Sequence, residues 1–437
     1  MPAWVRHAMF WHLYPLGFLN AEKEATGTIT HRLPALVPWL DYAVELGASG
    51  ILLGPIFASS THGYDTIDHF RIDPRLGDEA DFDALVEAAR ARGLRLVLDG
   101  VFNHVGRDFP LFREALHKGR RAPEAEWFRL SWPEDGGAPR YDNFEGHDQL
   151  VALNHEAPAV ADHVARVMTH WLERGASGWR LDAAYAVPPA FWEKVLPRVR
   201  EAHPEAYVFG EVIHGDYAGI VSAAGFDAVT QYELWKALWS SLNDRNLFEL
   251  AWALERHNGF LDAFVPQTFV GNHDVTRIAS RLSEPKHLAH ALLVLMTVGG
   301  TPSVYAGDEQ GFRGVKEERL GGDDAVRPAF PASAGELSEL GAPILRLHQD
   351  LIGLRRRHPW LHAAKTKKLS LSNEQLSYRS EAEGEAIVVA LNLASSAANV
   401  AVPDAGAVLA GEAELTAGGG ESAVASLPPY GWAVFSA

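Results

Sequence analysis

Residues 95–104 read Arg-Leu-Val-Leu-Asp-Gly-Val-Phe-Asn-His. A short run of aliphatic residues that stops at a Gly predicts a buried strand. The run ends in a carboxylate, Asp99, and an amphipathic stretch with helical spacing of its apolar residues precedes it at 81–92. The segment therefore predicts one strand of a parallel sheet, with polar side chains at the carboxyl end of the strand.

The same unit recurs along most of the chain. Apolar runs predict eight strands, at 9–14, 50–53, 95–102, 178–182, 207–210, 226–229, 267–270 and 302–305. Amphipathic stretches predict helices at 34–46, 81–92, 158–173, 189–202, 246–257 and 288–297, and a closing helix at 342–357. Eight alternating βα units indicate an α/β fold of the (β/α)8 TIM-barrel type.

Three parts of the chain depart from this alternation. Residues 104–157 are far longer than an ordinary barrel loop, which predicts an inserted small domain after strand 3. A second irregular stretch, 307–340, follows the eighth strand and is expected to overhang the same barrel mouth. From residue 361, short alternating runs predict a C-terminal antiparallel β domain, a β-sandwich over 361–437. The catalytic barrel then comprises 1–103 and 158–360.

Composition excludes several classes of protein. The 437 residues carry 39 basic and 56 acidic side chains, and the resulting net charge of −17 argues against nucleic-acid and membrane-surface binding. Because the sequence has no cysteine, disulfide scaffolds and thiolate metal sites are excluded. No apolar run reaches the roughly 18 residues of a membrane span, and residues 1–20 lack the apolar core of a signal peptide. The sequence therefore predicts a cytoplasmic protein.

Four carboxylates occupy equivalent places at the ends of predicted strands. Asp99, Asp182, Glu211 and Asp274 end the third, fourth, fifth and seventh strands. Because the carboxyl ends of parallel barrel strands open into one mouth, we expect these side chains to converge. A capping role or an ion pair explains one such residue, but four carboxylates placed directly after apolar runs are too costly for structure alone. They predict an active site.

The residues beside two of these carboxylates predict different protonation states. Arg180 lies two residues before Asp182 on the same face of the strand, where it would keep Asp182 ionised, as a nucleophile requires. Glu211 has no cation beside it in the sequence and follows Val208, Phe209 and Gly210, so we expect its pKa to rise toward that of a general acid. Such a pair is typical of glycoside hydrolysis.

The segments around these residues resemble the signature segments of the α-amylase family of glycoside hydrolases, in family order and over nearly the whole chain. The matching segments are Asp99–His104 (DGVFNH), Gly178–Asp182 (GWRLD), Gly210–Glu211 (GE), Gly271–Asp274 (GNHD) and His62–Asp65 (HGYD). The resemblance implies a maltodextrin-cleaving or α-glucosidase-like glycosidase.

The resemblance also implies a role for each matching residue. It identifies three catalytic residues: the nucleophile Asp182, the acid/base Glu211, and Asp274, which binds sugar hydroxyls as the ring flattens. It further identifies five substrate-binding or positioning residues: Tyr64, Asp99, His104, Arg180 and His273. Among these, Tyr64 matches the platform under the sugar that is cleaved, and Asp99 mainly serves as the partner of Arg180.

Two departures from the family pattern concern substrate and metal binding. Ala152 stands where an acidic or basic residue is common, so the family's substrate contacts there do not carry over. Asn103 matches a calcium-ligand position, with Asp142 and Asp148 as candidate partners. The loop 16–29 lacks the alternating Asp and Asn residues that would supply the six or more oxygens calcium prefers. We therefore expect no metal cofactor, with calcium at Asn103 as the alternative.

The leading function is a retaining α-glycoside hydrolase that cleaves short malto-oligosaccharides or related glucosides through an ester on Asp182. Ala183 favours α-1,4 bonds, because the resemblance places Val at this position in enzymes that prefer α-1,6 bonds. One alternative keeps the site but changes the acceptor, as in a transglycosylase or a trehalose-synthase-like sugar isomerase. Another, from a different class, is a non-catalytic binding or scaffold homologue.

The partners expected from the sequence are few. The substrate is an oligosaccharide, and neither nucleic acid nor membrane is expected to bind. The chain begins almost at its first predicted strand, without the leading β domain through which maltodextrin-cleaving members of the family commonly dimerise. A monomer is therefore expected.

Overall fold

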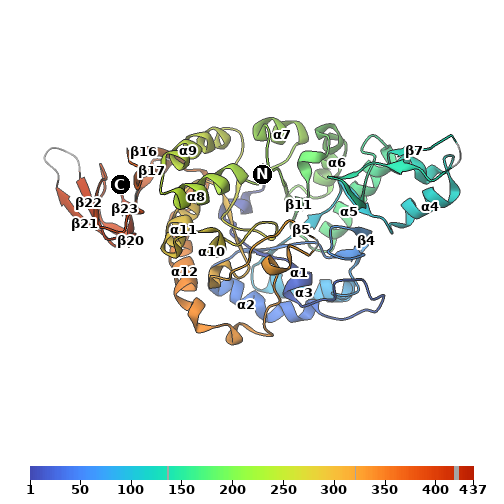
Figure 1. The fold of residues 1–437 in the computed structure, drawn as a ribbon, viewed down its shortest axis with the longest axis horizontal. Helices are drawn as coiled ribbons and strands as arrows, with labels where there is room; N and C mark the ends of the chain where they lie inside the picture. Colours follow the sequence, from blue (N-terminus) through green and yellow to red (C-terminus); the bar gives the residue numbers. More distant parts are fainter. Residues whose placement is uncertain (135–136, 320, 418–422) are drawn as a thin grey trace.

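The centre of the protein is a parallel β-barrel surrounded by helices (Figure 1). The computed structural model describes residues 1–134, 137–319, 321–417 and 423–437. Eight parallel strands form one sheet, in which consecutive barrel strands are paired except the sixth and seventh, and the first strand pairs with the eighth. A parallel bridge between Thr230 and Gln267 links the two end strands and brings the sheet close to a closed barrel. The predicted fold class is confirmed.

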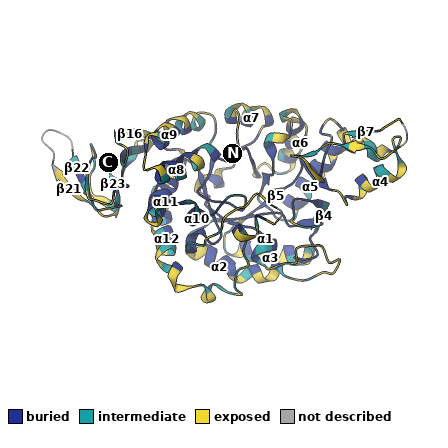
Figure 2. Cartoon of the chain, in the orientation of Figure 1, coloured by how far each residue is buried: buried dark blue, intermediate teal, exposed yellow. Residues whose placement is uncertain are grey.

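All eight predicted strands are present, and most of their residues are buried because helices cover the outside of the barrel (Figure 2). The barrel strands are β1 (Phe10–Leu13), β2 (Gly50–Leu53), β5 (Arg95–Gly100), β11 (Gly178–Leu181), β12 (Tyr207–Gly210), β13 (Ala228–Val229), β14 (Gln267–Phe269) and β15 (Thr301–Tyr305). Asp99 is the next-to-last residue of β5, Asp182 and Glu211 directly follow β11 and β12, and Asp274 lies in the loop after β14. The four side chains are therefore at the barrel mouth.

Seven of the barrel helices that the structure describes agree with the sequence pattern. The helices of the barrel are α1 (Pro15–Phe18), α2 (Val37–Leu46), α3 (Glu79–Ala91), α5 (Pro158–Glu173), α6 (Pro189–Ala202), α7 (Tyr217–Ala224), α8 (Tyr232–Asp244), α9 (Phe248–Leu261), α10 (Ile278–Arg281), α11 (Leu288–Thr297) and α12 (Ala342–Arg357). The sequence pattern did not predict α1, α7, α8 or α10, and α1 and α10 have only four residues each. Helix α7 has only eight residues, although it buries Tyr217, Val221 and Ala224 at helical spacing. Helix α8 also buries residues at helical spacing, so its signal was present.

The inserted segment after β5 forms a small antiparallel unit beside the barrel. Its strands and helix are β6 (His104–Gly106), α4 (Pro110–Lys118), β7 (Leu130–Ser131), β8 (Arg140–Tyr141), β9 (Asn143–Phe144) and β10 (His147–Ala152). Strand β10 lies between β6 and β9. A further hairpin, of β3 (Phe57–Ser59) and β4 (Thr66–Ile72), follows β2 and was not predicted. It carries Tyr64 in its turn.

The C-terminal part forms two antiparallel sheets at the end of the molecule opposite the inserted segment (Figure 1). The strands are β16 (Lys365–Leu371), β17 (Gln375–Ala382), β18 (Glu385–Asn392), β19 (Ala398–Ala401), β20 (Val408–Gly411), β21 (Glu414–Ala417), β22 (Ala423–Leu427) and β23 (Trp432–Ser436). Residues of both sheets share one apolar cluster: Val388, Ala390, Val400, Val402, Ala425, Leu427, Ala433 and Phe435. The exact domain boundaries stay a prediction.

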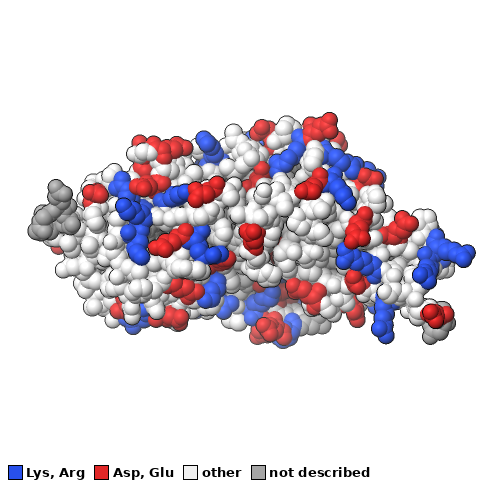
Figure 3. All heavy atoms as spheres, turned by 90° about the horizontal axis from the view of Figure 1, so that it is seen from above, with Lys and Arg blue, Asp and Glu red and all other residues white. Residues whose placement is uncertain are grey.

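The surface agrees with the acidic but mixed composition. Acidic and basic side chains are interspersed over the face shown in Figure 3, with no extended basic patch on that face. Across the described ranges, every helix is too short or too polar to cross a membrane.

Candidate active site

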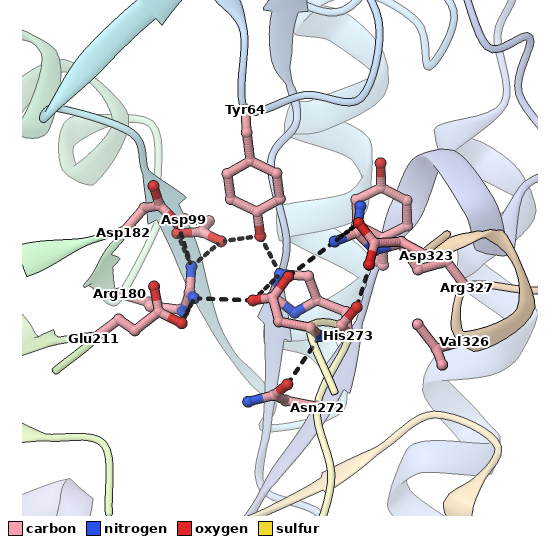
Figure 4. A network of polar contacts seen from close by, with 12 residues as sticks. Tyr64, Asp99, Arg180, Asp182, Glu211, Asn272, His273, Asp323, Val326 and Arg327 are labelled. Carbon is pink, nitrogen blue, oxygen red and sulfur yellow. Dashed lines mark hydrogen bonds and ion pairs between the residues drawn. The ribbon is translucent and has the colours of Figure 1, made fainter. Parts of the chain in front are cut away.

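The four predicted carboxylates lie around one guanidinium group, that of Arg180 on β11 (Figure 4). Its Nη1 atom lies 2.6 and 2.7 Å from the two carboxylate oxygens of Asp99. The same atom lies 3.4 Å from Asp182 Oδ1. Its Nη2 atom lies 2.6 Å from Glu211 Oε1 and 3.6 Å from Asp274 Oδ2. The convergence predicted from the strand ends is therefore present.

The cluster of Arg180 and the four carboxylates is shielded from solvent on every side but one. The side chains of Arg180, Asp182 and Glu211 are buried, and Asp99 is fully so. The side chain of Asp274 keeps 26% of its surface exposed and is the most open of the five. Burying this much charge is tolerable only because the guanidinium faces carboxylates directly. A substrate reaching the cluster would meet Asp274 at its open side.

The surroundings of Glu211 differ from those that its sequence neighbours indicate. No cation stands beside Glu211 in the sequence, but the Arg180 guanidinium lies closer to Glu211 than to Asp182. The cation was missed because it comes from the neighbouring strand: β11 pairs with β12, with Arg180 opposite Phe209. Burial and the Glu211 carboxylate raise the pKa of Asp182 well above its usual range. Arg180 acts in the opposite direction and lowers this pKa, so the ionised state of Asp182 stays a prediction.

Three groups fix the orientation of Glu211. The backbone N–H of Ala183 donates a hydrogen bond to Oε2 at 3.1 Å, and the Tyr232 hydroxyl donates one to Oε1 at 3.1 Å. The Asn272 amide in turn donates to the Tyr232 oxygen at 2.9 Å. Neither Tyr232 nor Asn272 was identified from the sequence. Tyr232 opens the unpredicted helix α8, whereas Asn272 lies inside the GNHD segment that was already recognised.

Tyr64 and His273 form a stacked pair next to Asp99. Their rings are 5.6 Å apart and parallel within 1°. The Tyr64 hydroxyl donates to Asp99 Oδ2 at 3.1 Å and also contacts Nε2 of His273, which lies 3.1 Å from Asp274 Oδ2. Burial and the nearby cations lower the pKa of His273 well below its usual range, so this imidazole is neutral. The Tyr64–His273 pair therefore links Asp99 to Asp274 through a chain of polar contacts across the barrel mouth.

A second guanidinium, that of Arg327, was missed by the sequence analysis. Its Nη2 atom donates to Asp274 Oδ1 at 2.8 Å and lies 3.3 Å from Asp323 Oδ2. Its Nε atom donates to the backbone carbonyl of His273 at 2.9 Å. Arg327 comes from the irregular stretch after β15, whose sequence shows no periodicity. The expectation that this stretch overhangs the barrel mouth agrees with these contacts.

His104 lies beside the mouth rather than in the Arg180 cluster. Its ring stacks on Phe144 of the inserted segment, with centroids 4.8 Å apart, and its Nδ1 atom is 3.1 Å from the Asn103 amide nitrogen. Burial lowers the pKa of His104 to about 3, so the ring is neutral. Its buried Nε2 atom has no hydrogen-bond partner in the part of the chain that the structure describes.

The residue after Asp182 has an unusual backbone. Ala183 is buried and adopts a left-handed conformation with φ of 45°. A β-branched residue is disfavoured there, so the backbone provides a second reason for a small side chain at this position. Two residues on, the Tyr185 hydroxyl donates to Glu145 Oε1 at 2.8 Å, which links the inserted segment to the loop that carries Asp182.

The residues around Asn103 were the candidates for a calcium site, and whether they bind calcium stays a prediction. A cavity of about 530 Å³ beside Asn103 is lined by Asp142 but also by the cation Arg129. Asp148 is engaged elsewhere, because its carboxylate accepts a hydrogen bond from the Asn143 amide at 2.8 Å. Within the described ranges, three or more side-chain ligands from His, Asp and Glu gather only at His31, Asp78 and Asp81. Calcium therefore enters no step proposed below.

Comparisons with known proteins agree with this geometry. The model of the alpha-amylase catalytic domain matches residues 12–381. Cyclomaltodextrinase from a Bacillus species is 30% identical over 419 residues, which cover 90% of this chain and 73% of that protein. Maltogenic alpha-amylase from Bacillus acidopullulyticus is 30% identical over 427 residues, 90% of this chain and 70% of the relative. The native debranching enzyme of Nostoc punctiforme superposes with a TM-score of 0.86 at 26% identity, covering 100% and 99% of the two chains.

Proposed function

Because the chain belongs to the alpha-amylase family of glycoside hydrolases, we propose that it cleaves α-1,4-glucosidic bonds in short malto-oligosaccharides with retention of configuration. The single observation that carries this proposal is the position of Asp182 and Glu211 on the two nitrogens of one guanidinium. Two carboxyl groups held close together at the end of a barrel suit a double displacement.

The proposed reaction has two steps. In the first, an oxygen of Asp182 attacks the anomeric carbon while Glu211 gives its proton to the departing glycosidic oxygen, which leaves a glycosyl ester on Asp182. In the second, Glu211 takes a proton from water, and the hydroxide oxygen attacks the anomeric carbon and releases Asp182. The first step needs the proton on Glu211 and an ionised Asp182, and the Arg180 guanidinium, 3.4 Å from Asp182 Oδ1, stabilises the ionised carboxylate.

The other residues bind and orient the sugar. Asp274, fixed by Arg327 and His273, is placed to accept hydrogen bonds from hydroxyls of the ring being cleaved. Tyr64 presents an aromatic ring beside the same cluster. Because Asp99 holds Arg180 through two short contacts, its role is to position the guanidinium rather than to touch the reacting atoms.

The stereochemistry of the first product tests the mechanism. We expect proton NMR to detect the α-anomer first when maltotriose is hydrolysed, because two inversions at one carbon restore the original configuration. Mutarotation to the β-anomer should follow only later. An initial β-anomer would mean that water attacks the sugar directly and that Asp182 is not a nucleophile.

Linkage preference is the second test. We expect kcat/KM for maltotriose to exceed that for isomaltose by tens to a few hundredfold. The reason is that one or two methyl groups more or fewer beside the nucleophile change the discrimination between α-1,4 and α-1,6 bonds by about 1–3 kcal/mol. Ala183→Val should narrow this gap and also lower the melting temperature, since φ at this position is 45°. Ala183→Gly, which suits that backbone, is the matched control and should keep the preference. Equal rates on both sugars would refute the role of Ala183.

One finding favours a second candidate, a debranching activity. The debranching enzyme of Nostoc punctiforme matches this chain over nearly the full length of both. A branch-cleaving enzyme would act on α-1,6 bonds, so the same comparison of maltotriose with isomaltose, extended to a branched dextrin, separates the two candidates. A preference for the branched dextrin would support the second one.

A further inference from the structure

A second cavity, of about 660 Å³, lies between α12 and the C-terminal β domain. Its lining includes Asp350, Gly353 and Arg357 of α12 and Glu412, Tyr430 and Trp432 of the β domain. No residue that lines it belongs to the Arg180 cluster. Figure 1 shows α12 next to β20 at this junction. The volume lies within the range of small-molecule binding sites.

Four polar side chains of this cavity have no partner within the described chain, whereas a fifth, Gln349, donates a hydrogen bond to the backbone carbonyl of Glu45. Asp350 and Arg357 are exposed and lie seven residues apart on α12, so they share one face of the helix. Glu412 faces the same cavity from the β domain. None of the three side chains forms a hydrogen bond or an ion pair with another residue of the described chain, and neither does the Trp432 indole N–H. The cavity therefore offers donors and acceptors that the protein does not use itself.

Gly353 keeps the floor of the cavity open. Glycine in the middle of a helix is destabilising by about 0.5–1 kcal/mol relative to alanine. Here neither backbone nor packing requires it, because Gly353 is helical and an added Cβ would meet only the Arg357 Nη1 atom, at 3.3 Å. The missing side chain leaves space between Asp350 and Arg357.

Tyr430 is held on the rim in a costly conformation. Its φ is 55°, a left-handed backbone that a bulky aromatic residue rarely adopts. The Lys286 ammonium lies 4.5 Å from the centre of its ring, and the His287 ring lies 5.8 Å away. Trp432, which is partly exposed, adds a second aromatic surface to the same cavity. Backbone strain of this kind concentrates at ligand sites.

We propose that this cavity is a second saccharide-binding site, which takes a segment of an α-glucan chain. Aromatic rings cover the apolar faces of sugar rings, while carboxylates and a guanidinium bind pairs of neighbouring hydroxyls. Two carboxylates with one guanidinium suit a neutral polyol better than an anion. The choice of an α-glucan rests on the proposed function. Such a site would hold a long substrate on the enzyme and raise its concentration near the catalytic carboxylates.

Calorimetry with maltoheptaose tests the site without turnover. In the Asp182→Asn protein, which should bind but not cleave, we expect two molecules of maltoheptaose per chain. Adding Gly353→Leu, which fills the cavity floor, should reduce this to one. Gly259→Leu is the matched control, because Gly259 is also a helical glycine but has no heavy atom within 4 Å of an added Cβ. One molecule per chain before any filling, or equal binding by both glycine variants, would overturn the proposal.

Kinetics separate this inference from the proposed function. In the otherwise native protein, Gly353→Leu and Trp432→Ala should each raise KM for amylose by about tenfold and leave KM and kcat for maltotriose within about twofold. Unchanged KM for amylose would contradict the second site while hydrolysis itself stands. Conversely, two bound maltoheptaose molecules on a protein that hydrolyses no α-glucan would support the second site and refute the proposed function.

Discussion

Asp182→Asn is expected to lower kcat on maltotriose by about four orders of magnitude and to leave the fold intact, because an amide of equal size cannot form the glycosyl ester. Steady-state kinetics and thermal unfolding, measured on the same preparation, check both parts. Azide should restore turnover in this variant by attacking the face that Asp182 leaves free. The product is then a glycosyl azide of β configuration. Near-normal turnover in the variant would refute Asp182 as the nucleophile.

Glu211→Gln is the matched variant for this experiment. Its kcat on maltotriose should fall by about as much as that of Asp182→Asn, because the leaving oxygen must depart without a proton. For a substrate with an activated leaving group, such as a nitrophenyl glucoside, kcat/KM should fall much less, since departure of that group needs no acid and kcat/KM does not include the later attack by water. Asp182→Asn should show no such difference between substrates. Equal losses on both substrates in Glu211→Gln would contradict the acid role.

The fold and the main carboxylates were predictable because they depend on local patterns. An apolar run followed by a carboxylate defines both a strand and its open end, so Asp99, Asp182 and Glu211 were found together with β5, β11 and β12. Signature segments added Tyr64, His104 and His273 only through a resemblance. Their contacts depend on the packing of the barrel mouth, which no local pattern specifies.

The protonation pattern and the second guanidinium were not predictable, because both depend on contacts between distant segments. Arg180 reaches Glu211 across the pairing of two strands, a contact that sequence neighbours do not indicate. Arg327 reaches Asp274 from a stretch without periodicity, so only the folded chain shows that this loop completes the site. The charge balance of the site is therefore a tertiary property.

Arg180→Met is expected to reduce both activity and stability strongly. The variant keeps the bulk of the side chain but leaves Asp99, Asp182 and Glu211 buried without their common cation. Breaking a buried ion pair by removing one partner costs about 3–5 kcal/mol, so the free energy of unfolding should fall by at least that range at neutral pH. Denaturant unfolding measures the loss. Arg256→Met, at the exposed ion pair with Glu233, is the control and should change little.

The loss in Arg180→Met should depend on pH in a definite direction. In the native protein burial raises the pKa of Asp99 to about 6, against 3.8 for an ordinary aspartate, even with Arg180 beside it. A carboxyl whose pKa is higher in the folded state holds its proton there, so its unfavourable effect is absent below about pH 4 and grows as pH rises. Without Arg180 the folded-state pKa of Asp99 rises further, so the destabilisation by this carboxyl continues to grow above pH 6. The stability difference between native protein and variant should therefore be small at pH 4 and large at pH 8. An equal difference at both values would show that Arg180 acts through packing rather than through its charge.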